Sequence, residues 1–197
     1  MTRSSSPSAP GSRHVSLVAL PDAVVSTLTG IFDVMNGIAI LGMMQAGTPA
    51  PINIEIVGEV PGPLELASGV PIKVQRSIDC IDTTDIIIVP SVLLPTQGWQ
   101  KGRYPVLVEW LQKMHDRGAI LCSACSGIFL LAETGLFDNK DATVHFAYAR
   151  AFAETYPGIA IHPERVLVIS GLREELVSSG ASMSWHDLVL YLIARYA

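Results

Sequence analysis

The chain has 197 residues, of which 49% are hydrophobic and 16% charged, and its net charge is −5. This composition indicates a folded globular protein and excludes a disordered chain. The negative net charge and the lack of clustered Lys and Arg residues argue against direct binding of nucleic-acid phosphates. An odd count of three cysteines argues against a disulfide scaffold and for a reducing compartment. No apolar run reaches the length of a membrane span. We therefore expect a cytoplasmic protein without a membrane segment.

The first 13 residues are rich in Ser and Pro and lack the apolar core of a signal peptide. We expect a disordered tail over residues 1–13 and one domain over residues 14–197. An apolar run predicts a strand over 15–20, and helical spacing, which includes Leu28, Ile31 and Met35, predicts a helix over 24–44. A second strand over 52–57 and a small hairpin over 64–74 follow.

The β-branched run over 85–90 is typical of a strand that is buried on both faces of a parallel sheet. After a loop over 91–103, the pattern predicts a helix over 106–115, a strand over 119–122 and a helix over 128–133. A turn over 135–140 leads to a short strand or loop over 142–146 and a helix over 147–156. A hairpin-like pair over 166–169 and 175–178 precedes a last helix over 185–196. This alternation of strands and helices predicts an α/β fold with a largely parallel sheet and helices on both faces.

Only the five residues from Ser123 to Gly127 separate the strand over 119–122 from the next helix. So short a connection must turn sharply, and Gly127 removes a side chain where the helix and the sheet crowd each other. Cys125 would then lie at the helix N-terminus, where amide N–H groups and the helix dipole favour a thiolate. The order strand, small residue, Cys, small residue, Gly and helix predicts a nucleophile elbow with Cys in place of Ser.

Other interpretations of the cysteines stay open. Cys122, inside the strand, is expected to be a small buried hydrophobic residue. Cys122 and Cys125 also form a C-x-x-C pair, but their different placement disfavours a dithiol redox role. No second Cys/His pair lies at zinc-finger spacing, so no metal site is expected. A redox sensor based on Cys125 alone is a further hypothesis.

One motif carries a resemblance to a known family. The sequence Cys125-Ser-Gly-Ile-Phe-Leu-Leu-Ala-Glu-Thr-Gly-Leu-Phe-Asp138, followed by Ala142-Thr-Val-His145, resembles the class I glutamine amidotransferase-like (ThiJ/PfpI) superfamily. Within it, the likeness is to the N-terminal domain of AraC-type transcriptional regulators, over residues 14–197. The resemblance implies a flavodoxin-like three-layer sandwich, a homodimer and no cofactor.

The resemblance also assigns candidate catalytic residues. Catalytic relatives use the elbow Cys with a His and an acid, and here Cys125 and His145 take the first two positions. A neutral imidazole could accept the thiol proton, or His145 could be a structural residue beneath the turn. The acid position holds Thr27, which cannot ionise, and Ser91 and Val92 stand where relatives often have a Gly pair that supplies oxyanion N–H groups. We therefore expect no efficient turnover.

The resulting hypothesis is a ligand-sensing and dimerisation domain of an AraC-type transcriptional regulator, and the alternative is a Cys-dependent small-molecule hydrolase or hydratase. DNA would be bound through a C-terminal pair of helix-turn-helix motifs that is absent from this chain. Small molecules bind outside the carboxyl ends of parallel strands, and we expect a small polar ligand, uncharged or anionic, at that edge. The predicted ligand-binding residues are Asp22, Thr27, Ser91, Val92, Cys125, Ser126 and His145.

Overall fold

The computed structural model describes residues 11–46 and 50–196, with side chains described for residues 11–40 and 50–196. Among these residues, a seven-stranded sheet has the order β10-β11-β7-β6-β1-β2-β5, and all its pairings are parallel except that of β10 with β11. Its strands are β1 (Arg13–Val18), β2 (Ile52–Gly58), β5 (Arg76–Ser77), β6 (Ile86–Val89), β7 (Ile120–Ala124), β10 (Leu167–Ser170) and β11 (Leu176–Ser179). Two small pairs lie outside it: β3 (Gly62–Glu65) with β4 (Pro71–Val74), and β8 (Asp141–Ala142) with β9 (Ala160–Ile161).

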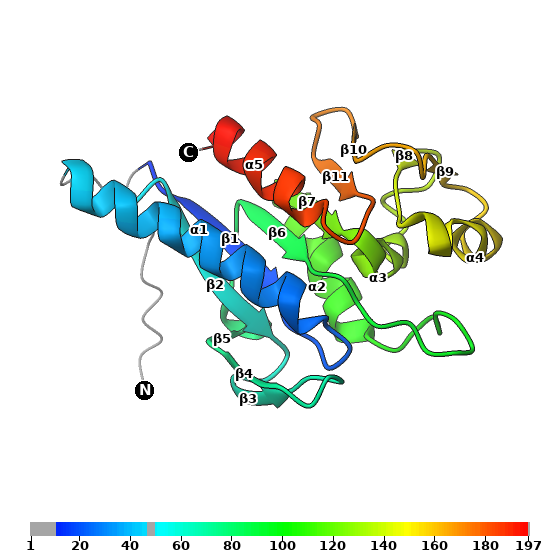
Figure 1. Cartoon of the computed structure of the whole chain (residues 1–197), viewed down its shortest axis with the longest axis horizontal. Helices are drawn as coiled ribbons and strands as arrows, with labels where there is room; N and C mark the ends of the chain where they lie inside the picture. The colour runs from blue at the N-terminus through cyan, green and yellow to red at the C-terminus, as the bar shows by residue number, and fades with distance from the viewer. Residues whose placement is uncertain (1–10, 47–49, 197) are drawn as a thin grey trace.

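Helices cover both faces of the sheet (Figure 1). Helices α1 (Val25–Ala46) and α5 (Trp185–Tyr196) pack side by side on one face, and α2 (Pro105–Asp116) and α3 (Ile128–Ala132) lie on the other. Helix α4 (Ala149–Thr155) lies beside the β8–β9 pair. The connections from β1 to β2 and from β6 to β7 run in opposite directions along the sheet, so right-handed crossovers place their helices on opposite faces. The predicted three-layer α/β sandwich is confirmed.

The core lies between these layers. All four residues of β6 are 0% exposed, as the β-branched run predicted for a strand covered on both faces. Leu28, Ile31 and Met35 of α1 are also fully buried. No helix within the described ranges is both long and apolar enough to cross a membrane.

Some predicted boundaries were wrong. Arg13 was assigned to the tail, but it begins β1 and pairs with Ile52; residues 1–10 of the predicted tail lie outside the described residues. The predicted helix over 147–156 starts as a 3-10 turn over Phe146–Tyr148 and becomes α-helical at Ala149. The two-residue strands β5 and β9 were not predicted, because so short a segment carries no alternation of apolar and polar residues.

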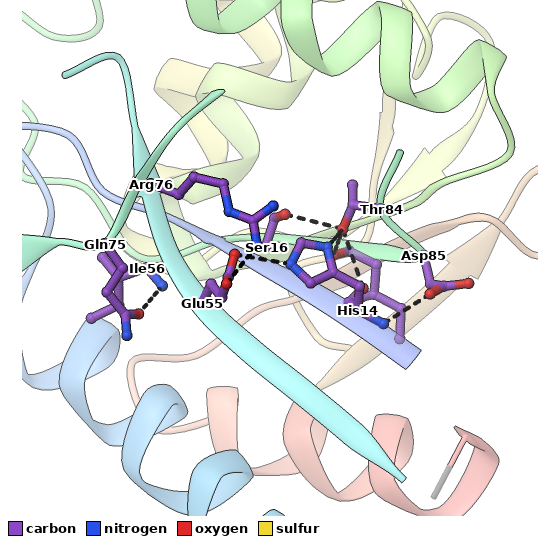
Figure 2. A network of polar contacts seen from close by, with 9 residues as sticks. His14, Ser16, Glu55, Ile56, Gln75, Arg76, Thr84 and Asp85 are labelled. Carbon is purple, nitrogen blue, oxygen red and sulfur yellow. Dashed lines mark hydrogen bonds and ion pairs between the residues drawn. The ribbon is translucent and has the colours of Figure 1, made fainter. Parts of the chain in front are cut away.

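A network of polar side chains connects neighbouring strands near the amino ends of β1 and β6 (Figure 2). The buried His14 ring places Nδ1 2.9 Å from Thr84 Oγ1 and Nε2 3.2 Å from Glu55 Oε2. Arg76 Nη2 donates to Glu55 Oε1 at 2.6 Å, and Asp85 accepts the His14 backbone N–H at 2.8 Å. Burial raises the pKa of Glu55, but the hydrogen bonds from Arg76 and His14 outweigh it and hold this pKa below its usual range. The network joins β1, β2, β5 and the start of β6.

Candidate ligand-binding site

The connection between β7 and α3 is as sharp as predicted. Strand β7 ends at Ala124, a 3-10 turn spans Cys125–Gly127, and α3 starts at Ile128. Cys125 has a φ of 50°, in the left-handed region that residues other than glycine seldom adopt. A Cβ on Gly127 would lie 2.5 Å from the Pro90 carbonyl oxygen and 2.6 Å from that of Val89. The predicted need for Gly127 is confirmed, whereas a nucleophilic role for Cys125 stays a prediction.

The Cys125 thiol is buried, with 6% of the residue exposed. Burial raises its pKa above the ordinary value, and the polar groups of Ser126 and Ser91 near the thiol lower it only in part. Helix α3 has five residues, too few for a strong dipole. Both observations run against the expected preference of Cys125 for a thiolate and favour the neutral thiol. Cys122 is fully buried in β7, as predicted.

The loop after β6 is locked to the turn and to the start of α1. The Ser126 hydroxyl donates to the Val92 carbonyl oxygen at 2.6 Å and accepts the Val92 N–H at 2.9 Å. The Thr27 hydroxyl donates to Ser91 Oγ at 3.2 Å, and the Val24 N–H donates to the Ser91 carbonyl oxygen at 2.8 Å. Because Ser126 occupies the Val92 N–H, this amide is not free to bind an oxyanion.

His145 is half-buried at the start of the 3-10 turn over Phe146–Tyr148. Its Nδ1 accepts the Ala147 N–H at 3.2 Å, and its ring stacks on Phe146 with centroids 4.4 Å apart. A neutral imidazole that accepts at Nδ1 carries its hydrogen on Nε2, so it has no free lone pair for a thiol proton. This geometry favours the structural interpretation of His145 over that of a general base for Cys125.

A cavity of about 310 Å³ opens beside Cys125. It lies where β1 and β6 end and their connections diverge, which is the switch point at which open α/β sheets bind ligands. Its lining holds five Ser and Thr side chains and no Asp, Glu, Lys or Arg. The lining residues are Val24, Ser26, Thr27, Ser91, Val92, Leu93, Cys125, Ser126, His145, Tyr148, Ser182, Met183 and Trp185.

The cavity brings together every predicted ligand-binding residue except Asp22. Asp22 Oδ2 instead accepts the Tyr104 hydroxyl at 2.6 Å and pairs with Arg103 Nη1 at 2.7 Å. The structure therefore does not place this carboxylate beside Cys125.

Other lining residues were missed by the sequence analysis, Tyr148, Met183 and Trp185 among them. The order of the elements along the chain could have predicted Met183 and Trp185. Strand β11 runs parallel to β7 and ends at Ser179, so the chain between it and α5 must lie at the same edge of the sheet as Cys125.

The described residues contain no group of three His, Cys, Asp or Glu side chains that could hold a metal ion. The cysteines Cys80, Cys122 and Cys125 are free thiols, and Cys80 is exposed.

Comparisons with known proteins agree with this architecture. Residues 25–193 match the DJ-1/PfpI family. The HTH-type transcriptional regulator CdhR of Pseudomonas aeruginosa is 27% identical over 173 residues, which cover 83% of this chain and 49% of CdhR. The HTH-type transcriptional regulator GbdR of the same species is 30% identical over 129 residues, 66% of this chain and 33% of GbdR. The chain thus spans half or less of the length of these relatives.

Solved structures show the same fold. A putative transcriptional regulator protein from Vibrio parahaemolyticus has a TM-score of 0.75 at 19% identity, covering 93% of both chains. An AraC family transcriptional regulator from Pseudomonas putida has a TM-score of 0.73 at 18% identity, covering 93% of this chain and 92% of the other. Because the family match extends over most of the sequence, the chain belongs to the DJ-1/PfpI family.

Proposed function

We propose that this chain is the ligand-sensing and dimerisation domain of an AraC-type transcriptional regulator, which binds a small molecule beside Cys125 without transforming it efficiently. The observation that carries the proposal is the lining of the Cys125 cavity, which offers hydroxyl groups but no carboxylate. Such a site can hydrogen-bond a ligand, but it lacks the acid that completes the Cys and His set of catalytic relatives.

Three features of the site favour binding over turnover. The Cys125 thiol has a raised pKa and is a weak nucleophile in its neutral form. His145 uses Nδ1 to accept the Ala147 N–H. Thr27, at the acid position, donates its hydroxyl to Ser91. Losing one preorganised oxyanion donor costs on the order of 100-fold in rate, and here the acid is missing as well.

The lining also narrows the class of ligand. Among the lining side chains, only Cys125, His145 and Tyr148 can titrate. A ligand with a large positive charge would find no carboxylate partner there. Hydroxyls from Ser26 and Ser182 can donate to a carbonyl or carboxylate oxygen. A small polar ligand, uncharged or anionic, fits this set of groups.

The regulatory role is supported by the relatives, since CdhR and GbdR are both named HTH-type transcriptional regulators. In such an arrangement a separate helix-turn-helix domain would contact DNA, and this acidic domain would sense the ligand and pair with a second copy. The net charge of −5 fits a domain that does not itself contact phosphates.

Two measurements test the regulatory role. The first is the gene sequence beyond the codon for Ala197: a continuous frame that encodes two helix-turn-helix motifs supports the role, and a frame that closes at Ala197 contradicts it. The second is sedimentation of the chain at micromolar concentration, where a dimer is expected and a monomer at all concentrations contradicts the dimerisation role.

A Cys-dependent hydrolase or hydratase is the second candidate. The observation that favours it is the left-handed backbone of Cys125 together with the presence of His145 in the same cavity. Incubation of the chain with small amides, aldehydes and isonitriles tests it by NMR. Product formation that a Cys125→Ser variant abolishes supports the enzyme, and unchanged substrates exclude it for these classes.

A further inference from the structure

A second cavity, of about 280 Å³, lies at the carboxyl ends of β1 and β2. It shares no lining residue with the Cys125 cavity, because the segment 21–24 runs between them: Pro21 lines the second cavity and Val24 the first. Apolar side chains make most of its wall, namely Leu20, Leu64, Val74 and Leu107. Leu20, Val74 and Leu107 are each at most 2% exposed, so they belong to the fixed core of the domain.

The floor and one wall of this cavity are held in place by backbone contacts. At the floor, a Cβ on Gly58 would lie 3.0 Å from the Ala19 carbonyl oxygen and 3.3 Å from a methyl group of Val74, so β1, β2 and β4 approach closely there. The β3–β4 hairpin forms the wall, and the Ala67 N–H donates to the Pro21 carbonyl oxygen at 2.8 Å. The hairpin is thus tied to the segment that separates the two cavities.

The polar groups of the cavity come from the start of α2. Arg103 Nη1 lies 2.7 Å from Asp22 Oδ2, and the Tyr104 hydroxyl donates to the same oxygen at 2.6 Å. Asp22 thereby neutralises the positive charge of Arg103, and Glu59 adds a negative charge to the lining. The lining therefore has no surplus positive charge for an anion. The Tyr104 hydroxyl keeps lone pairs that can accept a hydrogen bond, and the Arg103 guanidinium has further N–H groups that can donate one.

We propose that this cavity is a second small-molecule site, which takes an uncharged molecule with an aromatic or branched aliphatic body and one hydroxyl or amide group. The body would lie against Leu20, Leu64, Val74 and Leu107, and the polar group would contact Arg103 and Tyr104. Because an apolar cavity of about 150 Å³ suffices for benzene, this cavity suits a molecule of about eight to twelve heavy atoms.

Benzyl alcohol is a probe of this class, with benzoate and benzylammonium as its charged counterparts. Each is titrated into the ¹⁵N-labelled full chain and followed by NMR. Benzyl alcohol is expected to shift the amide signals of Leu20, Val74 and Leu107 and to bind at least tenfold more tightly than benzoate. It should also bind more tightly than benzylammonium, whose charge would lose water against the apolar wall. Equal binding of all three, or shifts confined to the Cys125 cavity, overturns the proposal.

Variants separate this site from the Cys125 cavity. Leu64→Trp, on the half-buried hairpin wall, fills the cavity and should weaken benzyl alcohol at least tenfold, whereas Cys125→Trp should leave it unchanged. Unaltered binding to a folded Leu64→Trp chain contradicts the site. If that variant does not fold, the binding of toluene, which lacks the hydroxyl group, is compared with that of benzyl alcohol. Wild type should bind benzyl alcohol more tightly than toluene, and Arg103→Gln should reduce this difference in affinity at least threefold. A preference that survives Arg103→Gln contradicts the polar contact.

Discussion

Ser126 and Val92 are joined by two hydrogen bonds through a single hydroxyl, which donates to the Val92 carbonyl oxygen at 2.6 Å and accepts its N–H at 2.9 Å. Ser126 follows Cys125 in the sharp turn, and Val92 lies in the loop after β6. The pair therefore fixes the wall of the Cys125 cavity and also removes the Val92 N–H from any catalytic use.

Replacement of Ser126 tests this lock. Ser126→Ala leaves both backbone groups of Val92 buried without a partner, and we expect a loss of about 2 kcal/mol in the free energy of unfolding. The matched control is Ser182→Ala, an exposed lining residue whose loss should cost less than about 0.5 kcal/mol. Urea unfolding measures both, and equal costs would contradict the lock.

Two glycines next to the cavity should respond differently to alanine. In Gly127→Ala the new Cβ meets the carbonyl oxygens of Val89 and Pro90, which belong to rigid backbone, so we expect a loss of about 3 kcal/mol. In Gly30→Ala it meets a side chain and not backbone, the Trp185 ring at 2.6 Å, and the gain in helix propensity of about 1 kcal/mol offsets part of the strain. Thermal unfolding should show that Gly127→Ala is less stable than Gly30→Ala. A Gly127→Ala chain as stable as wild type would contradict the close contact between position 127 and the backbone of Val89 and Pro90.

The Cys125 thiol should react slowly at neutral pH. Because burial raises its pKa, the half-point of iodoacetamide labelling against pH should lie above the value of about 8.5 of a free cysteine. A Cys80→Ser chain isolates Cys125, since Cys122 is fully buried, and a Cys125→Ser chain reports the exposed Cys80 as control. Selective oxidation of Cys125 by mild peroxide, or a half-point below that of Cys80, would contradict this expectation and support the redox-sensor hypothesis.

The His14 network predicts acid sensitivity. The pKa of Glu55 is held below its ordinary value in the folded chain, so its stabilising contribution is present above about pH 4.3 and is lost as the pH falls through the folded pKa. Glu55→Gln should therefore lower stability at pH 7 and reduce the further loss between pH 5 and pH 3. Glu65→Gln, at an exposed position, is the control. Urea unfolding at pH 7, pH 5 and pH 3 measures the free energy of unfolding of each variant. An acid-induced loss as large in Glu55→Gln as in wild type contradicts the network.

The sequence predicted those parts of the fold that local patterns determine. The β-branched run at β6 and the glycine at position 127 each reflect a constraint that acts on neighbouring residues or on one element against the sheet. Features set by distant contacts were missed. The side chain of Asp22 is oriented by Tyr104, 82 residues away in sequence, and the raised pKa of Cys125 depends on how the surrounding loops bury the thiol.

The most direct test of the central claim, binding without turnover beside Cys125, is ligand-observed NMR with a matched panel of small carboxylic acids, amides and amines on wild type and on a folded Cys125→Trp variant. Acids or amides should bind wild type, and amines should bind more weakly. The Cys125→Trp variant should bind none of them, and wild type should leave the compounds chemically unchanged after a day. Consumption of the compounds, a preference for amines, or binding that persists in Cys125→Trp would contradict the claim.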